Sequence, residues 1–222
     1  MPHRKSPKAA LPYLPLEVEE IIIDQLSDNT NALRSCTLTR RSWVTRSQFH
    51  LLQAIRIKTR AQLDVLYRHF DANPPRRALV RSVTVAPDSP KERAYLLGIF
   101  PHALLTGLPS LRTWVIQDVD ASDDHQKTRP GQPNLSFHKT TLTQLRYTTI
   151  EELHLSHILF GSDGELIRLI VSLPHLRHLQ YTHLHFRRHG GLVSPGSFTR
   201  ILHSLSALDV SRFLVKSISP CI

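Results

Sequence analysis

Histidine is the residue type that first suggests a chemical function, because the chain of 222 residues contains 14 of them. Two pairs, His154 with His157 and His175 with His178, have the i, i+3 spacing that would suit a metal ion on a helix. The segments around them are instead expected to be strands, in which residues three apart point to opposite faces. No cysteine cluster, His-Glu-x-x-His sequence or obvious carboxylate partner accompanies them. The sequence therefore predicts no metal site.

Catalytic residues are not evident either. Cys36 falls on the apolar face of an expected helix, where a buried and inert thiol is the usual outcome. Among only 8 glycines there is no Gly-rich phosphate loop. We therefore expect no enzyme and no cofactor. Cys36 and Cys221 are too few for a disulfide framework, which favours a reducing compartment, cytoplasmic or nuclear.

The composition is typical of a globular chain, with 41% apolar and 21% charged residues. No run approaches the roughly 18 apolar residues of a membrane-spanning helix, so no membrane partner is expected. The first residues are basic and lack the apolar stretch of a secretory signal. Residues 1–10 are expected to be a disordered basic tail.

The formal net charge of +10 raises the question of nucleic acid. The basic residues are spread along the sequence, as in Arg40-Arg41, Arg76-Arg77 and Arg187-Arg188, rather than gathered on one predicted face. No zinc-finger spacing or RNA-recognition motif accompanies them. Nucleic acid is therefore not an expected partner.

An amphipathic helix is predicted at residues 14–26, LPLEVEEIIIDQL, with Pro15 suited to its first position. Val18, Ile22 and Leu26 repeat at i, i+4 and i+8 and form an apolar stripe, which neighbouring isoleucines widen.

The polar residues 27–31 then supply capping side chains, and 32–43 follow as a second helical stretch that ends in Trp43. Three short helices within about 45 residues cannot bury this much apolar surface alone. The surplus either packs on the rest of the chain or is left for a partner.

The ordered residues of this region resemble an F-box. The resemblance is carried by Leu14-Pro15-x-Glu17-Val18-x3-Ile22-x3-Leu26, Leu33-x2-Cys36-x-Leu38, Arg41-Ser42-Trp43 and Phe49-His50-x4-Ile55. It implies a three-helix module over residues 11–58 that docks onto the Skp adaptor, and through it onto a cullin-based ubiquitin ligase. Thr39-Arg40 departs from the usual apolar residues before the tryptophan. Carried over by position, the docking residues are Leu14, Pro15, Val18, Ile22, Leu26, Leu38 and Trp43.

Internal repeats follow the helices. Residues 151–160 and 177–186 align with each other: both have apolar residues at the third and fifth places, then a hydroxyl, His, an aliphatic residue and, two places further on, Phe. Weaker copies precede and follow them. The equivalent positions, at spacings of 31, 39, 26 and 29 residues, are Val83, Trp114, Leu153, Leu179 and Leu208.

These spacings resemble leucine-rich repeats, each a strand followed by a helix. A polar loop near 118–134 accounts for the longest spacing. Helix signals lie between the strands, where a capping residue precedes an apolar helical period: Ser89-Pro90 before KERAYLLGIF, Asp163 before GELIRLIVSL, and Ser194-Pro195 before GSFTRILHSL. The predicted fold class is mixed α/β: an F-box module, then a short, irregular leucine-rich-repeat-like solenoid over residues 59–222.

Repeat proteins usually bind partners through the exposed face of their strands, although such a face is also compatible with simple solvation. The residues expected to point outward are Ser82, Thr84, Thr113, Val115, Glu152, His154, Ser156, His178, Gln180, Thr182 and Asp209. Of these, the predicted partner-binding residues are Glu152, His154, His178, Gln180 and Thr182.

Two hypotheses follow. In the first, the chain is the substrate-recognition subunit of a Skp/cullin/F-box ubiquitin ligase and binds an unknown protein substrate through its repeats. In the second, it is a leucine-rich-repeat scaffold or protein-interaction module whose N-terminal helices only cap the solenoid. A basic nucleic-acid binder is the weakest third hypothesis.

Overall fold

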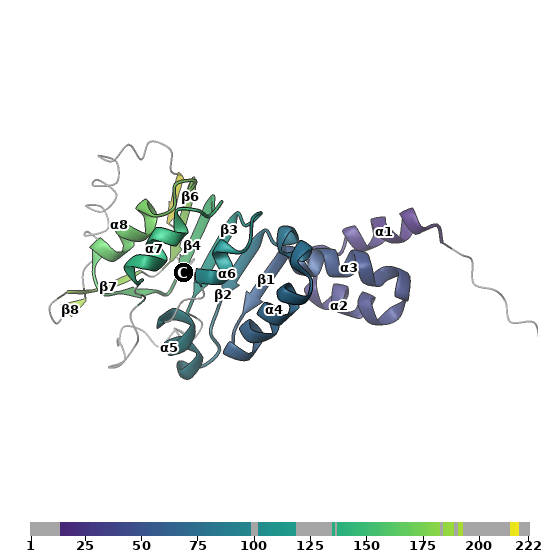
Figure 1. Ribbon diagram of the computed structural model, residues 1–222, viewed down its shortest axis with the longest axis horizontal. Helices are drawn as coiled ribbons and strands as arrows, with labels where there is room; N and C mark the ends of the chain where they lie inside the picture. The colour runs from purple at the N-terminus through teal and green to yellow at the C-terminus, as the bar shows by residue number, and fades with distance from the viewer. Residues whose placement is uncertain are drawn as a thin grey trace, which may run out of the picture. The chain divides into compact units, whose positions relative to one another are not determined.

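The chain forms two compact units, one ending at Leu52 and the other beginning at Gln53 (Figure 1). The computed structural model describes residues 14–98, 102–118, 135, 137–182, 184–188, 191–192 and 214–217. The tail expected at 1–10 lies outside these residues. Within the described part of the chain, no helix is both long and apolar enough to cross a membrane.

Three helices make up the first unit: α1 (Leu16–Asp24), α2 (Thr30–Thr39) and α3 (Arg41–Gln53). The start of α2 matches the expected polar break, since the Asn29 side chain accepts a hydrogen bond of 3.0 Å from the Ala32 amide. Arg40 has an extended backbone and separates α2 from α3. Trp43 therefore lies in the first turn of α3, and the expectation that it ends the second helix was wrong.

The inward face of α1 is not the predicted stripe. Glu19 and Ile23 are the buried residues of this helix, whereas Val18 and Ile22 are exposed. Pro15 is the residue before the helix rather than its first residue, and its carbonyl accepts hydrogen bonds of 3.1 Å from the amides at positions 18 and 19. Leu33 and Cys36 of α2 are also buried.

The second unit is mixed α/β and contains a sheet of six parallel strands. Its strands, in spatial order, are β1 (Ala54–Ile57), β2 (Ser82–Val85), β3 (Thr113–Gln117), β4 (Glu152–Ser156), β6 (His178–Thr182) and β9 (Leu214–Ser217). Spatial order follows chain order throughout, and every neighbouring pair is parallel. Each connection must therefore cross back to the start of the next strand, which requires a long crossover segment.

The strand register confirms most of the repeat alignment. Val83 pairs with Trp114, Trp114 with Leu153, and Leu153 with Leu179. The next residue in this row is Val215. The predicted equivalent, Leu208, lies outside the described residues, and the strand beside β6 begins six positions further along.

The first strand lies within the range that the sequence predicts to be helical. Ile55 was included in a helical module over 11–58, whereas Ala54–Ile57 form β1 and Ile55 pairs with Val83 of β2. The sheet therefore begins inside the stretch that had been attributed to the helices.

Each of the two best-matched repeats forms two strands rather than one. After β4 the chain turns at His157, which has a positive φ of 57°, a conformation uncommon outside glycine. It then forms β5 (Leu159–Phe160), which pairs with β7 (His185–Arg188), and β7 pairs with β8 (Gly191–Leu192). Phe160 and Phe186 are register partners with stacked rings 6.0 Å apart, as their equivalent places in the two repeats predict.

Helices connect the strands of the main sheet. They are α4 (Arg60–Ala72), the 3₁₀ helix η1 (Pro74–Leu79), α5 (Pro90–Gly98), α6 (His102–Thr106), α7 (Lys139–Leu145) and α8 (Asp163–Val171). Apolar side chains of α4, α6, α7 and α8 enter one core with the strands, over one face of the sheet (Figure 1). The sequence predicted α5 and α8. The helix expected after Ser194-Pro195 lies outside the described residues.

Inward and outward residues alternate along the central strands. Buried side chains in β2, β3, β4 and β6 include Val83, Val85, Trp114, Ile116, Leu153, Leu155 and Leu179. The residues between them are half-buried or exposed. The predicted outward positions are confirmed from Ser82 to Thr182, and Asp209 lies outside the described residues.

The sequence predicts that Asp118 begins a polar surface loop, and this prediction was wrong. Its side chain is buried at the end of β3, where Oδ1 lies 2.8 Å from Nη2 of Arg93 on α5. The remainder of the expected loop, residues 119–134, lies outside the described residues.

Candidate functional site

Exposed apolar side chains on α1 and just before it form the first candidate interaction surface, which we call the α1 surface. Its members are Leu14, Leu16, Val18, Ile21 and Ile22, all classed among the exposed large apolar residues of the chain. Ile21 is the most exposed of the five, at 58%. Grouped apolar side chains on a protein surface are typical of sites that bind another protein.

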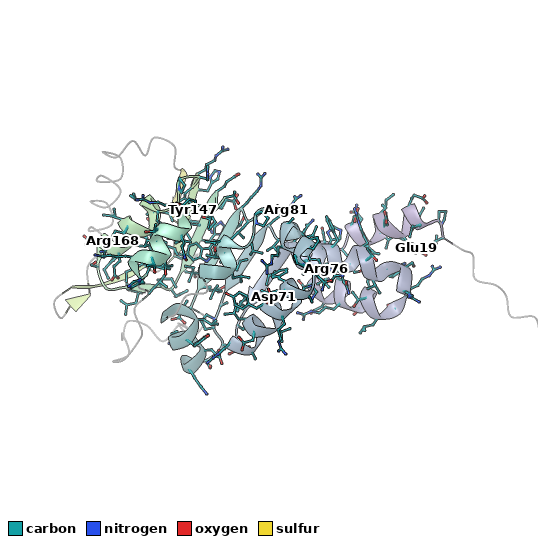
Figure 2. All side chains as sticks on the ribbon, viewed as in Figure 1. Glu19, Asp71, Arg76, Arg81, Tyr147 and Arg168 are labelled. Atoms are coloured by element: carbon teal, nitrogen blue, oxygen red, sulfur yellow. The ribbon has the colours of Figure 1, made fainter. Side chains whose placement is uncertain are left out.

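Glu19 fixes which face of α1 turns inward. This residue is labelled in Figure 2. Only 2% of it is exposed, yet its carboxylate is satisfied: Ser42 Oγ donates a 2.8 Å hydrogen bond to Oε2, and the Arg40 guanidinium pairs with Oε1. An unpaired buried carboxylate would be strongly destabilising. Arg40, one of the two residues that depart from the F-box pattern, thus has a structural role inside the helical unit.

A second polar contact holds α1 against α3. Asp24 accepts two hydrogen bonds of 2.6 Å from Arg46 and lies 2.7 Å from Nε2 of His50. These bonds, that from Arg46 above all, hold the pKa of Asp24 well below its usual range. Together with Glu19, Asp24 orients α1 so that the side chains of the α1 surface face outward.

The predicted docking residues differ in their exposure. Leu14, Pro15, Val18, Ile22 and Leu38 are exposed, and Leu38 at 88% has almost no contact with the rest of the chain. Leu26 and Trp43 are half-buried.

Two exposed apolar residues, Leu16 and Ile21, were missed as docking candidates. In the sequence pattern, Ile21 only widens the predicted apolar stripe. For Ile21 the signal was present: once Glu19 and Ile23 are taken as the inward pair, Ile21 lies on the opposite side of the helix. Leu16 lies three residues before Glu19, on the inward side, and is exposed at the first position of the helix.

The outward face of the parallel sheet is the second candidate surface, which we call the sheet surface. The register places its residues in cross-strand rows. The first row is Ser82, Thr113, Glu152 and His178; the second is Thr84, Val115, His154 and Gln180; the third is Gln117, Ser156 and Thr182. All five predicted partner-binding residues therefore lie on one face and on two adjacent strands.

Some polar groups of the sheet surface are already engaged. Thr113 donates a 3.0 Å hydrogen bond to Glu152 Oε2, and His154 Nε2 lies 3.8 Å from the same oxygen. Thr182 donates a 2.8 Å bond to Ser156 Oγ. In the described part of the chain, the side chains of His178 and Gln180 make no such contact, so their donors and acceptors remain available to a partner.

The histidine pairs do not converge on a metal. His154 lies on the sheet surface and His157 in the turn after β4, while His175 and His178 are exposed around the start of β6. Among the described residues, no group of three or more potential ligands is placed to hold a metal ion. Cys36 is a buried free thiol.

Comparisons of the chain with protein-family models, with curated proteins and with solved structures found no match.

Proposed function

We propose that this chain is a substrate-recognition subunit of a Skp/cullin/F-box ubiquitin ligase and has no catalytic activity of its own. In this proposal the helical unit docks onto the Skp adaptor, and the second unit binds a protein substrate. The observation that carries the proposal is the α1 surface: five large apolar side chains exposed on one short helix and the residues before it.

The energetics favour a role in binding for these side chains. Covering a large apolar side chain completely is worth about 1.5–3 kcal/mol, so five partly exposed ones represent a substantial driving force for association. Two carboxylates of the helix, the buried Glu19 and the half-buried Asp24, make polar contacts with α3 and with Arg40, and these contacts hold the helix in this orientation. A helix with only an internal role would place its isoleucines inward instead.

The second unit supports the repeat part of the proposal. Parallel strands follow one another in chain order, and the row from Ile55 to Val215 repeats at 28, 31, 39, 26 and 36 residues by subtraction. Apolar side chains of the helices pack on one face, and the strand residues that point to the other face are half-buried or exposed. We infer an irregular leucine-rich-repeat-like solenoid, whose open face is the sheet surface.

The experiment is reconstitution with a purified Skp adaptor. The full chain is mixed with the adaptor and run on a sizing column, and the proposal expects one complex containing both proteins. Failure to form it with a folded chain would leave the alternative, a repeat scaffold or protein-interaction module outside the ubiquitin system.

A further inference from the structure

A row of charged residues lies where four strands of the sheet begin. Arg81, Arg112, Glu151 and Arg177 immediately precede β2, β3, β4 and β6. Successive backbone hydrogen bonds join them: the amide of Arg112 donates to the carbonyl of Arg81 at 2.8 Å, that of Glu151 to Arg112 at 2.8 Å, and that of Arg177 to Glu151 at 2.7 Å. We call these four residues the charged row.

The charged row changes the interpretation of the basic composition. Its residues are far apart in the sequence, and the basic residues were expected not to gather on one face. The parallel register brings them onto neighbouring strands, which are about 4.8 Å apart. Three arginines thus lie within about 14 Å along one margin of the sheet.

Two of the three arginines are available for an external partner. Arg112 has its Nη1 3.3 Å from Oε1 of Glu151, so part of its charge is already compensated. Arg81 and Arg177 are exposed, and neither makes an ion pair or side-chain hydrogen bond within the described residues. An exposed guanidinium without a partner can bind a carboxylate through two parallel hydrogen bonds.

An exposed aromatic residue adjoins the charged row. Tyr147 is 83% exposed, and the segment that carries it is held beside β3 by a 2.7 Å hydrogen bond from Thr149 Oγ1 to the carbonyl of Leu111. Tyr147 and Arg81 lie along the same margin of the second unit in Figure 2. Tyrosine and arginine are the residue types that most often contribute binding energy at protein interfaces.

We propose that the charged row, together with Tyr147, binds an Asp- and Glu-rich segment of a partner protein, which lies extended across the strands. About four to five residues of extended chain span the distance from Arg81 to Arg177. The segment's carboxylates pair with the arginines at the two ends of the row, and its apolar atoms pack on the tyrosine ring. This surface adjoins the sheet surface and does not depend on adaptor binding.

A protein segment fits the charged row better than a nucleic acid does. Glu151 places a carboxylate inside the row, where a continuous phosphate backbone would be repelled. Nucleic-acid affinity arises from many phosphate contacts together, and three arginines supply few. A peptide can place a neutral or basic residue opposite Glu151 and acidic residues on either side.

The test is fluorescence polarisation with the full chain and labelled probes. The main probe is a peptide of about twelve residues with alternating Glu and Ser, enough to span the row in any register. Its matched probes replace every Glu by Gln, or every Ser by phosphoserine, and a single-stranded DNA of similar length is the fourth. We expect the Glu peptide to bind, its affinity to fall with added salt, and the Gln peptide not to bind.

Charge reversal locates the site. Arg81→Glu with Arg177→Glu should weaken binding of the Glu peptide about tenfold or more, since two attractions become repulsions. The matched control is Arg68→Glu with Arg168→Glu, which makes the same change in net charge on exposed residues of α4 and α8 and should leave binding unchanged. Unaltered melting curves would show that both variants fold.

Three results would overturn the proposal. The Glu and Gln peptides could bind equally well, or the two double variants could lose the same affinity for the Glu peptide. The third is that the phosphoserine peptide or the DNA binds while the Glu peptide does not. Adaptor binding, measured on the same samples, reports separately on the proposed ligase role. Loss of peptide binding with the adaptor still bound therefore bears on the charged row alone.

Discussion

Ser42 on α3 donates a hydrogen bond of 2.8 Å from its hydroxyl to Glu19 on α1, although the carboxylate of Glu19 is almost completely buried. The guanidinium of Arg40, the residue between α2 and α3, supplies the compensating charge. Because one buried carboxylate is held by two neighbouring residues, α1 has a fixed rotation about its axis. That rotation exposes the α1 surface.

Removing the compensating charge should destabilise the helical unit. We expect Arg40→Ala to lower the free energy of unfolding by about 1–3 kcal/mol, because Glu19 loses a charged hydrogen-bond donor. Arg41→Ala, one residue on and exposed, should change it by no more than about 0.5 kcal/mol. Denaturant unfolding followed by circular dichroism measures both, and equal effects of the two variants would show that the Glu19 contact is energetically unimportant.

The contact between Asp24 and Arg46 should make stability depend on pH. The pKa of Asp24 is lower in the folded state than in the unfolded chain, where it is about 3.9. The stabilisation that the contact gives is therefore fully present above the unfolded pKa and is lost as the pH falls through the folded pKa. We expect Asp24→Asn to be less stable than the wild type at pH 7, and the difference to shrink below about pH 4. Melting temperatures from pH 7 to pH 2.5 test this, with Asp28→Asn as an exposed control. A difference that stays constant over the whole range would contradict the proposed origin.

Buried and outward side chains alternate along β4, so the adjacent residues Leu153 and His154 belong to the core and to the sheet surface respectively. Leu153→Ala should destabilise the second unit by about 2–5 kcal/mol, because it leaves a cavity beside Trp114 and Leu179. His154→Ala removes a side chain from the sheet surface and should cost no more than about 0.5 kcal/mol. Unfolding curves of the two variants check the register directly, and the reverse order of effects would mean that it is shifted by one residue.

The buried pair of Arg93 and Asp118 should be sensitive to the loss of one partner. Asp118→Ala leaves a buried guanidinium without its carboxylate, and we expect a loss of about 3–5 kcal/mol in unfolding free energy. The double variant Arg93→Met with Asp118→Leu should recover most of that loss, since no isolated charge remains. If the double variant is as unstable as Asp118→Ala, packing rather than charge explains the effect.

Much of the sheet was predictable because its residues repeat in the sequence. The spacing of apolar residues predicts that Val83, Trp114, Leu153 and Leu179 are equivalent positions of successive repeats, and the structure pairs them on neighbouring strands. The strand that contains Ile55 was missed, because four residues between two helices resembled the end of the helical module.

The contacts that orient the surfaces were not predictable in the same way. Glu19 appears in the sequence as an ordinary acidic residue of a first helical turn, and nothing local indicates that it is buried against Ser42. The pairing of Asp118 with Arg93 likewise joins the end of a strand to a separate helix. The charged row was hidden for a related reason: its members become neighbours only once the strands are paired.

Adaptor docking by α1 is the central claim, and isothermal titration of the purified adaptor into the folded chain tests it most directly. The wild type should bind. Ile22→Asp should weaken binding about a hundredfold or more, because it places an unpaired charge in an apolar interface. Val65→Asp makes the same chemical change at an exposed apolar position of α4 and should bind as the wild type does. Circular dichroism must show that both variants are folded. A folded Ile22→Asp variant that binds the adaptor with wild-type affinity, or a wild type that does not bind it, would contradict the account.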